Sequence, residues 1–183
     1  MGKHKDKDKA HRDKAAAVDP ASLPYRPCVG VVLFSADGRV FVGERRGDGE
    51  EGKSLSNPWQ MPQGGIDEGE EPEIAARREL MEETGVVRAS LIAEAPEWVR
   101  YDLPAELVGK AWKGRYRGQI QKWFAFRFEG EDGDINVLAP PGGHKPEFSA
   151  WRWEPLENVP ALVVPFKRAV YEKVVAAFRH LAA

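Results

Sequence analysis

A stretch of three glutamates constrains this chain most, because it lies in a segment with clear signals for a helix. The letters RRELMEETG cover residues 77–85 and follow Pro72. Proline suits the first turn of a helix, where a missing N–H costs little, and glycine suits the position just past the end. Residues three and four apart share one face of a helix, so Glu79, Glu82 and Glu83 converge on one patch. We call this segment the glutamate helix.

Like charges at helical spacing repel each other, so this face is unfavourable unless something offsets its charge. One interpretation is a solvated surface, where the glutamates pair with arginines such as Arg77 and Arg78 at about 1 kcal/mol or less per pair. The other is a site for a hard divalent cation, which prefers carboxylate oxygens as ligands. The preceding letters PQGGIDEGEE (62–71) favour the cation site, because glycine lets the backbone approach a ligand closely.

Apolar periodicity predicts strands interspersed with two helices. The expected strands cover residues 29–34, 39–43, 86–93, 98–101, 119–128 and 151–154, with a hairpin turn at the letters ADG between the first two. The glutamate helix draws its apolar side from Ile74, Ala75, Leu80 and Met81, and a second amphipathic helix covers residues 165–181. Strands and helices do not alternate regularly, so we expect an α/β sandwich with a mixed sheet, not a doubly wound fold.

The chain has 183 residues, a length that suits one domain with a sizeable core. It opens with a low-complexity run of alternating charge, so we expect residues 1–20 to form a disordered tail and residues 21–183 to form the domain. The formal net charge of −2 does not demand a nucleic-acid partner. The single cysteine, Cys28, excludes an internal disulfide and argues against a cysteine-based zinc site.

The sequence also lacks the usual signals for membranes and export. No apolar run approaches the roughly 20 residues needed to cross a bilayer, and no apolar stretch follows the basic N-terminal residues. We therefore expect a cytoplasmic protein that does not bind membranes, and the sequence predicts no stable protein partner.

The glutamates belong to a longer pattern. From Gly64 the chain reads glycine, five residues, Glu70, seven residues, and then RELMEETGV over residues 78–86. This pattern resembles the Nudix box at every defined position, and on it the chain is identified as a member of the Nudix hydrolase family. The resemblance implies an α/β/α sandwich with a mixed sheet, which hydrolyses a pyrophosphate bond in a nucleoside diphosphate linked to another group. It also implies Mg²⁺ or Mn²⁺ as cofactor.

The chemistry explains why such a site needs several carboxylates. A phosphoanhydride repels nucleophiles through its own negative charge, and divalent cations neutralise that charge and activate a water. The metal ligands that the resemblance implies are Glu79, Glu82, Glu83 and the carbonyl of Gly64. Arg78 is expected to orient a carboxylate and so to support catalysis, with Glu70 as its partner.

Stretches outside the box resemble one branch of the family, the RNA pyrophosphohydrolases, also described as dinucleoside polyphosphate hydrolases. They are YRPCVGVVLF (25–34), PWQMPQGGID (58–67), RYDLP (100–104), GQIQKWFAFRF (118–128), PEFSAWRW (146–153) and VPFKRAVYEKV (164–174). The loop over residues 47–57 resembles the alphaproteobacterial version. Members remove pyrophosphate from the triphosphorylated 5′ end of RNA and cut diadenosine tetraphosphate. The implied substrate is therefore an RNA 5′ end or a dinucleoside polyphosphate.

The resemblance also assigns residues outside the box. Glu147 matches a glutamate that approaches the metals from a loop, so the role of general base stays divided between Glu83 and Glu147. Arg26 matches an arginine that contacts the 5′ phosphates or the first base. Phe166 and Lys167 match the segment beside the nucleobase, although Phe166 would equally suit a core position. The other implied substrate contacts are Gln63, Tyr101, Arg115 and Lys122, the last two within a basic stretch that would attract a polyphosphate.

Two alternatives stay open within the same fold. One is a Nudix hydrolase that acts on another nucleoside diphosphate derivative. The other is a non-catalytic module that binds RNA or a nucleotide, but such proteins usually lose the box glutamates and this chain has all three. The four histidines are not clustered outside the tail, which excludes a histidine-triad hydrolase, and the single cysteine excludes a zinc deaminase.

Overall fold

The computed structural model describes residues 19–47 and 57–182. Asp19 caps a short 3₁₀ helix, Pro20–Ser22, by accepting a hydrogen bond from the Ala21 N–H. Apart from Asp19 and Pro20, the predicted tail lies outside the described residues. So do residues 48–56, which make up most of the loop that resembles the alphaproteobacterial version.

The centre of the molecule is a mixed sheet of eight strands. The strands are β1 (Tyr25–Phe34), β2 (Val40–Arg45), β3 (Trp59–Gln60), β4 (Gln63–Gly65), β5 (Ala89–Glu94), β6 (Val99–Asp102), β7 (Gly118–Phe128) and β8 (Phe148–Glu154). The main path runs β3-β2-β1-β7-β5, with β4 paired to β1, β6 to β7 and β8 to β2. The long strands β1 and β7 run parallel, whereas the other pairs are antiparallel. The predicted mixed sheet is confirmed.

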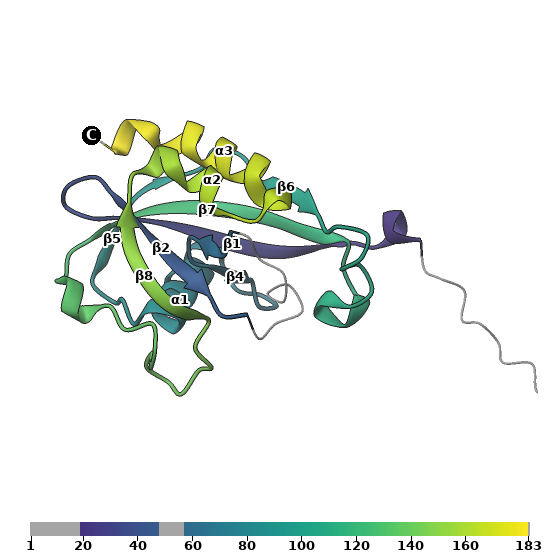
Figure 1. Cartoon of the computed structure of the whole chain (residues 1–183), viewed down its shortest axis with the longest axis horizontal. Helices are drawn as coiled ribbons and strands as arrows, with labels where there is room; N and C mark the ends of the chain where they lie inside the picture. The colour runs from purple at the N-terminus through teal and green to yellow at the C-terminus, as the bar shows by residue number, and fades with distance from the viewer. Residues whose placement is uncertain (1–18, 48–56, 183) are drawn as a thin grey trace, which may run out of the picture.

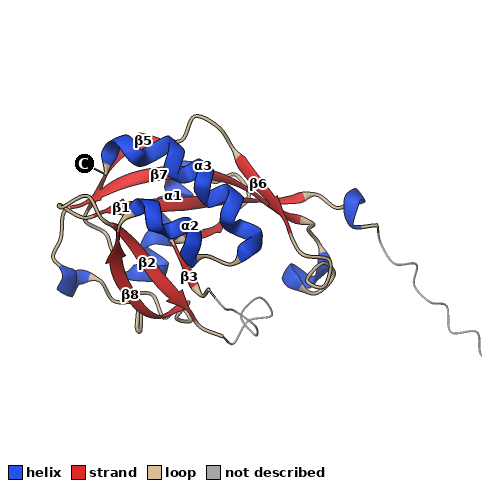
Figure 2. Ribbon diagram, turned by 45° about the horizontal axis from the view of Figure 1, so that its top comes forward, coloured by secondary structure: helices blue, strands red, loops and turns tan. Residues whose placement is uncertain are grey.

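Helices cover both faces of this sheet, as Figures 1 and 2 show. On one face lies α1 (Pro72–Thr84), whose Ala75, Ala76 and Leu80 pack into a core with alternate residues of β1 and β7. On the other face lie α2 (Val159–Leu162) and α3 (Arg168–Phe178), in a second core. Two cores on opposite faces of one sheet make the α/β/α sandwich that the sequence predicts.

The glutamate helix is α1, and its ends follow the sequence signals. Pro72 opens it, and Gly85 closes it with a left-handed φ of 77° while its N–H donates to the carbonyl of Met81. The predicted apolar side was partly wrong, because Ile74 is 57% exposed. The buried stripe instead contains Ala76, Leu80 and Thr84, four residues apart, and Ile74 lies about 200° around the helix from Ala76. The inward face of α1 also carries the buried Glu83.

The predicted C-terminal helix is also present, although its ends are tighter than expected. A 3₁₀ turn, Pro165–Lys167, leads into α3, and a second 3₁₀ turn, Arg179–Leu181, ends it. The periodic residues of α3, among them Val170, Val174 and Phe178, are buried against the sheet. The indole of Trp123 and the ring of Tyr171 meet in this core at 5.4 Å between centroids.

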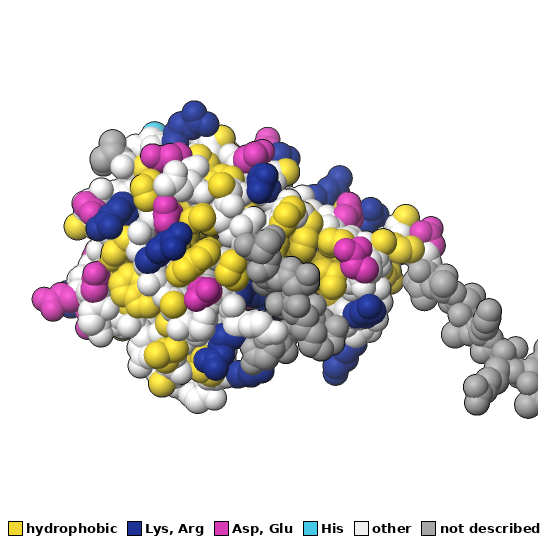
Figure 3. Space-filling model, in the orientation of Figure 1, with side chains coloured by type: hydrophobic (Ala, Val, Ile, Leu, Met, Phe, Trp, Pro, Cys, Tyr) yellow, Lys and Arg dark blue, Asp and Glu magenta, His cyan; other side chains and the backbone are white. Residues whose placement is uncertain are grey.

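The surface is mixed in charge. On the face shown in Figure 3, acidic and basic side chains are interspersed with apolar ones. No described helix combines the length and apolar character that crossing a bilayer needs. Any strong electrostatic preference must therefore come from local groups of residues rather than from the average charge.

Candidate active site

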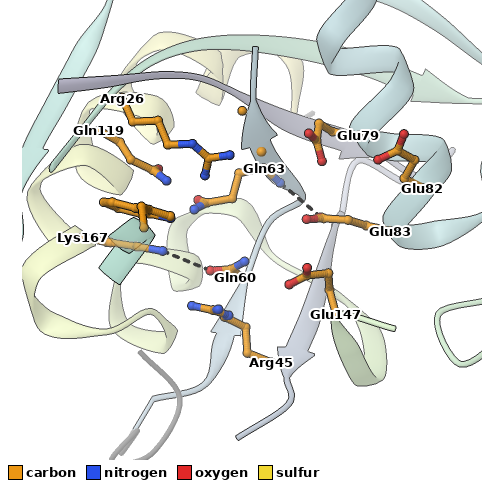
Figure 4. A pocket seen from close by; sticks show the side chains of 13 residues that line it. Arg26, Arg45, Gln60, Gln63, Glu79, Glu82, Glu83, Gln119, Glu147 and Lys167 are labelled. Carbon is orange, nitrogen blue, oxygen red and sulfur yellow. Dashed lines mark hydrogen bonds between the residues drawn. The ribbon is translucent and has the colours of Figure 1, made fainter. Parts of the chain in front are cut away.

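A cavity of about 360 Å³ opens beside the glutamate helix. Its lining residues are Arg26, Arg45, Gln60, Gln63, Gly64, Gly65, Glu79, Glu82, Glu83, Trp112, Gln119, Glu147 and Lys167. Figure 4 shows the glutamates on one side of this space, and Arg26, Arg45 and Lys167 on the other. The cavity thus has an acidic wall and a cationic wall that face each other.

The acidic wall comes mainly from α1, with one contribution from the residue before β8. Glu83 is 5% exposed, and burial raises the pKa of its carboxyl well above the usual value, with further increases from the charges of Glu79 and Glu147. Burial also raises the pKa of Glu79, against the opposing effect of Arg78. Desolvation and mutual repulsion therefore disfavour the charged carboxylates in this wall, and a bound cation would offset both effects.

Arg78 holds the acidic wall in place from behind. Its guanidinium makes a two-bond fork to Glu70, with both nitrogen–oxygen distances at 2.8 Å. It also donates to Oε1 of Glu79 and to the carbonyl oxygen of Gly65, again at 2.8 Å. The expected pairing of Arg78 with Glu70 is present, and it lowers the pKa of Glu70 to about 2. Arg78 thereby connects α1 to the glycine loop that precedes it.

Glu83 is held from the sheet side. The backbone N–H of Gln63 in β4 donates to Oε2 of Glu83 over 3.2 Å. The side-chain oxygen of Gln63 accepts a hydrogen bond from the hydroxyl of Tyr171 in α3, also over 3.2 Å. The same hydroxyl accepts from the backbone N–H of Met61. The C-terminal helix on one face of the sheet is thus connected to the buried glutamate on the other.

Two glycines of β4 allow side chains to approach the backbone closely. A Cβ atom at Gly64 would collide with the carboxylate of Glu79, and one at Gly65 would collide with the guanidinium of Arg26. The glycines at these positions therefore let an acidic and a basic side chain both reach the same short strand. Gly64 lies in the cavity lining beside Glu79, and the resemblance implies its carbonyl as a further ligand.

The donor set of the acidic wall suits Mg²⁺ or Mn²⁺, because carboxylate and carbonyl oxygens are the ligands these ions prefer. Within residues 19–47 and 57–182, no three His, Cys, Asp or Glu side chains are already arranged around one point. The hydrogen bonds explain this, since Arg78 draws Glu79 aside and the Gln63 N–H holds Glu83.

The cationic wall is assembled from three separate parts of the chain. Arg26 comes from the start of β1, and Lys167 from the 3₁₀ turn before α3. Arg45 ends β2 where a bulge between Glu44 and Arg45 shifts the pairing with β8, and such bulges redirect a side chain beside many active sites. Lys167 is 2% exposed, and its ammonium donates to Oε1 of Gln60 over 3.3 Å.

Trp112 closes the cavity beside Arg26. The guanidinium carbon of Arg26 lies 5.7 Å from the centroid of the Trp112 ring. Trp112 and Lys113 have positive φ angles of 49° and 59°, which bulky residues rarely adopt. A backbone held this way indicates that the surrounding structure fixes the position of the indole.

The structure brings most of the predicted site residues together. Those that line the cavity are Arg26, Gln63, Gly64, Glu79, Glu82, Glu83, Glu147 and Lys167. Tyr101 and Phe166 lie just behind the lining, with ring centroids 5.6 Å apart. The ammonium of Lys167 is 5.6 Å from the Tyr101 ring and 6.0 Å from the Phe166 ring. These two rings therefore pack against each other and support Lys167.

Arg115 and Lys122 are not brought to the cavity, contrary to the expected substrate contacts. Lys122 points to the α1 face of β7, where its ammonium contacts Glu94 at 2.8 Å and donates to the Ala95 carbonyl at 2.7 Å. Side chains alternate along a strand, so the cavity receives Gln119 and not Lys122. The guanidinium of Arg115 lies over the ring of Tyr116 instead. Lys122 therefore stabilises the fold through Glu94 and the Ala95 carbonyl and does not line the cavity.

Sequence reasoning missed Arg45, Gln60, Gly65, Trp112 and Gln119. The signal for Gln119 was available, because the alternation of GQIQKW places Gln119, Gln121 and Trp123 on one face of a strand. Arg45 carried no such signal, since its direction depends on the bulge. Trp112 lies in a loop whose conformation no local pattern predicts.

Comparisons with known proteins agree with this geometry. A protein named RNA pyrophosphohydrolase from Mesorhizobium japonicum is 58% identical over 170 residues, which cover 92% of this chain and 98% of the relative. A protein of the same name from Brucella ovis is 55% identical over 184 residues, which cover 100% of both chains. These relatives confirm the resemblance to the RNA pyrophosphohydrolase branch.

Solved structures share the fold at lower identity. The E. coli dihydroneopterin triphosphate pyrophosphohydrolase has a TM-score of 0.60 and 24% identity, covering 84% of this chain and 98% of its own. A C. elegans Ap4A hydrolase has a TM-score of 0.58 and 17% identity, covering 85% of this chain and 98% of its own. The NUDIX domain profile matches residues 24–174. With this match and the close relatives, the chain belongs to the NUDIX domain family.

Proposed function

We propose that this chain is a metal-dependent pyrophosphohydrolase that removes pyrophosphate from the 5′-triphosphate end of RNA, hydrolyses dinucleoside polyphosphates such as diadenosine tetraphosphate, or does both. The observation that carries the proposal is the division of the cavity into an acidic and a cationic wall. A polyphosphate with its divalent cations suits both walls at once. The name of the relatives at 55% and 58% identity favours the RNA end.

The acidic wall is the proposed cofactor site. Its ligands are Glu79, Glu82, Glu83, Glu147 and the Gly64 carbonyl. Bound Mg²⁺ or Mn²⁺ supplies neutralisation of the polyphosphate charge and activation of a water. Arg78 does not reach the cavity lining, so it supports the reaction by orienting Glu79 and by connecting α1 to the glycine loop.

The opposite wall binds and orients the phosphate chain. Arg26, Arg45 and Lys167 supply positive charge from three elements, so they can contact successive phosphates. Water forms a new bond to phosphorus and gives up a proton to the general base, the phosphoanhydride bond breaks, and the departing phosphate group, which is pyrophosphate for an RNA substrate, leaves with the bonding electrons. We assign the general base to Glu83, because it is buried in the cavity wall and burial raises its pKa, so its carboxylate accepts a proton more readily than an ordinary one, while the exposed Glu147 completes the ligand set.

The test is a side-by-side assay with Mg²⁺. Triphosphorylated RNA and diadenosine tetraphosphate are offered at equal concentration, and kcat/KM is measured for both with Glu83→Gln as control. We expect pyrophosphate from the RNA and loss of turnover in the variant. Turnover of neither substrate by the unaltered protein would contradict the proposal. Equal turnover by Glu83→Gln would remove Glu83 from the reaction.

A further inference from the structure

Three side chains on one face of β7 form a hydrogen-bonded chain that ends at the cavity. The indole Nε1–H of Trp123 donates to Oε1 of Gln121 over 3.0 Å. The Nε2 amide of Gln121 then donates to Oε1 of Gln119 over 2.8 Å. Gln119 is 5% exposed, and Gln121 and Trp123 are fully buried. The three alternate along the strand, so they share the face that leads from the α3 core to the cavity.

The indole determines the direction of this chain. An indole nitrogen can only donate, so the amide of Gln121 must turn its oxygen towards Trp123. The nitrogen of Gln121 then faces Gln119, which must accept this hydrogen bond through its side-chain oxygen. Reversing either amide would oppose two donors or two acceptors inside the protein, where an unsatisfied polar group costs its full desolvation penalty. The carboxamide nitrogen of Gln119 is thereby left on the cavity side.

The anchor of the chain cannot shift easily. A Cβ atom at Gly30 would collide with the ring of Trp123, so the strand beside it packs directly on the indole. Tyr171 packs edge-on against the other side of the ring, with an interplanar angle of 76°. A fixed indole keeps both amides in one orientation. The same amides exposed to solvent would be free to rotate.

The nitrogen of Gln119 faces the space that the substrate would occupy. Gln119 lines the cavity next to Arg26, its direct partner in the pairing of β1 with β7 (Figure 4). Across the described residues, no protein group accepts a hydrogen bond from this nitrogen. Arg26 also offers only donors, so the two residues form a surface that matches an oxygen-rich acceptor.

We propose that Gln119 contacts the substrate as a fixed hydrogen-bond donor, and that Gln121 and Trp123 are positioning residues that set its direction. The inference rests on the proposed function, because the ligand is the acceptor oxygen of a nucleotide substrate. That oxygen belongs either to the phosphate chain or to a carbonyl of the nucleobase. A donor pointed permanently inward favours either oxygen over an amino group at the same position.

The first experiment compares Gln119→Met with Gln119→Glu. The methionine side chain keeps the length of glutamine and removes the donor, whereas glutamate replaces the donor by a charged acceptor. A hydrogen bond to a charged oxygen is worth enough to raise KM about 10- to 100-fold in Gln119→Met, with a much smaller change in kcat. Gln119→Glu should raise KM further. Unchanged KM in Gln119→Met on every substrate would overturn the proposal.

The second experiment tests whether the chain of amides acts through Gln119. Trp123→Phe removes the indole donor and should raise KM in the unaltered background, but not in the Gln119→Met background. A loss of core packing alone would change both backgrounds equally and overturn the positioning role. If Trp123→Phe does not fold, Gln121→Met interrupts the same chain. Trp98→Phe, which alters a tryptophan that is 44% exposed outside the cavity lining, is the matched control.

The third experiment identifies the acceptor. Inorganic tripolyphosphate and triphosphorylated RNA are compared as substrates for Gln119→Met. Loss on both supports a phosphate oxygen, and loss on RNA alone supports a base carbonyl. Equilibrium binding of a non-hydrolysable nucleoside triphosphate analogue with Mg²⁺ gives a separate readout. If the unaltered protein binds the analogue more tightly than Gln119→Met but does not turn over RNA, Gln119 stands and the proposed function fails.

Discussion

The backbone N–H of Gln63 donates to the buried carboxylate of Glu83 over 3.2 Å, and this contact joins the sheet to the glutamate helix. Among the described residues it is the only hydrogen bond to Glu83, and it lowers the pKa of that carboxyl, which burial and the charges of Glu79 and Glu147 raise. Those opposing effects are larger, because the pKa of Glu83 is raised overall. The protein therefore folds around a carboxylate whose charge is disfavoured by its own surroundings.

Replacing Glu83 by glutamine should separate stability from activity. A carboxyl with a raised pKa binds its proton more tightly in the folded state, so its contribution to stability falls as the pH rises above the ordinary carboxyl pKa of 4.5. Glu83→Gln should remove that decline and raise the Tm at neutral pH in the presence of a chelator, while activity falls about 10²- to 10⁴-fold. Thermal unfolding from acid to neutral pH checks it. The exposed Glu172→Gln should change neither quantity.

Gly64→Ala should lower activity more than stability. Its new methyl group meets the carboxylate of Glu79, which is the end of a flexible side chain and can move away. The displaced carboxylate would leave the cavity wall, so we expect kcat/KM to fall about 10- to 100-fold, as for residues that orient metal ligands. Gly133→Ala is the control, since nothing lies within 4 Å of a Cβ atom there. Equal activity in both variants would count against the role of Glu79.

Arg78→Lys should reduce activity although the charge is retained. Lysine cannot make the two-bond fork to Glu70 and reach Glu79 and the Gly65 carbonyl at the same time. We expect kcat/KM to fall about 10- to 100-fold with a weaker apparent affinity for Mn²⁺. Arg39→Lys alters an exposed arginine paired with Asp37 and should leave both unchanged. Metal titration of activity measures the effect.

The ionised carboxylate of Glu70 should contribute to the loss of folding stability at acid pH. Its pKa is lowered from 4.5 to about 2, chiefly by the hydrogen bonds from Arg78. A lowered pKa means that the stabilisation is fully present above 4.5 and is lost as the pH falls from there through about 2. Glu70→Gln should therefore unfold more readily at neutral pH and show a flatter stability curve in acid. Denaturant unfolding between pH 4.5 and about pH 2 measures the free energy of unfolding of both proteins. A variant curve parallel to that of the unaltered protein would refute this role of Glu70.

Tyr171→Phe should destabilise the protein from inside the core. The substitution leaves the ring against Trp123 but removes the hydroxyl between Met61 and Gln63. The buried N–H of Met61 loses its acceptor, so we expect a loss of about 1–3 kcal/mol in the free energy of unfolding. Tyr25→Phe, which removes an exposed hydroxyl bonded to Asp102, should lose much less. Urea denaturation of both variants gives the comparison.

The sequence predicts local features well when the signal lies in neighbouring residues. Pro72 and Gly85 defined the ends of α1, and the three glutamates are found on the cavity wall. Ile74 was assigned to the wrong face because a helix with small inward residues gives a weak apolar period. The prediction that Lys122 contacts the substrate was wrong, because one step along a strand moves a side chain to the opposite face of the sheet. Arg45 depended on a bulge, which is a property of two strands together.

The parallel pairing of β1 with β7 also determines when the site can form during synthesis and folding. Arg26 meets Gln119, and Tyr25 meets Gly118, although most of the domain separates these strands in the chain. A ribosome releases β1 long before β7, so the first strand must wait without its main partner while the glutamate helix is already complete. Contacts between distant segments form slowly, because a long loop must close first. The two walls of the cavity therefore meet late in synthesis, after β7 has emerged and Glu147 and Lys167 have followed it.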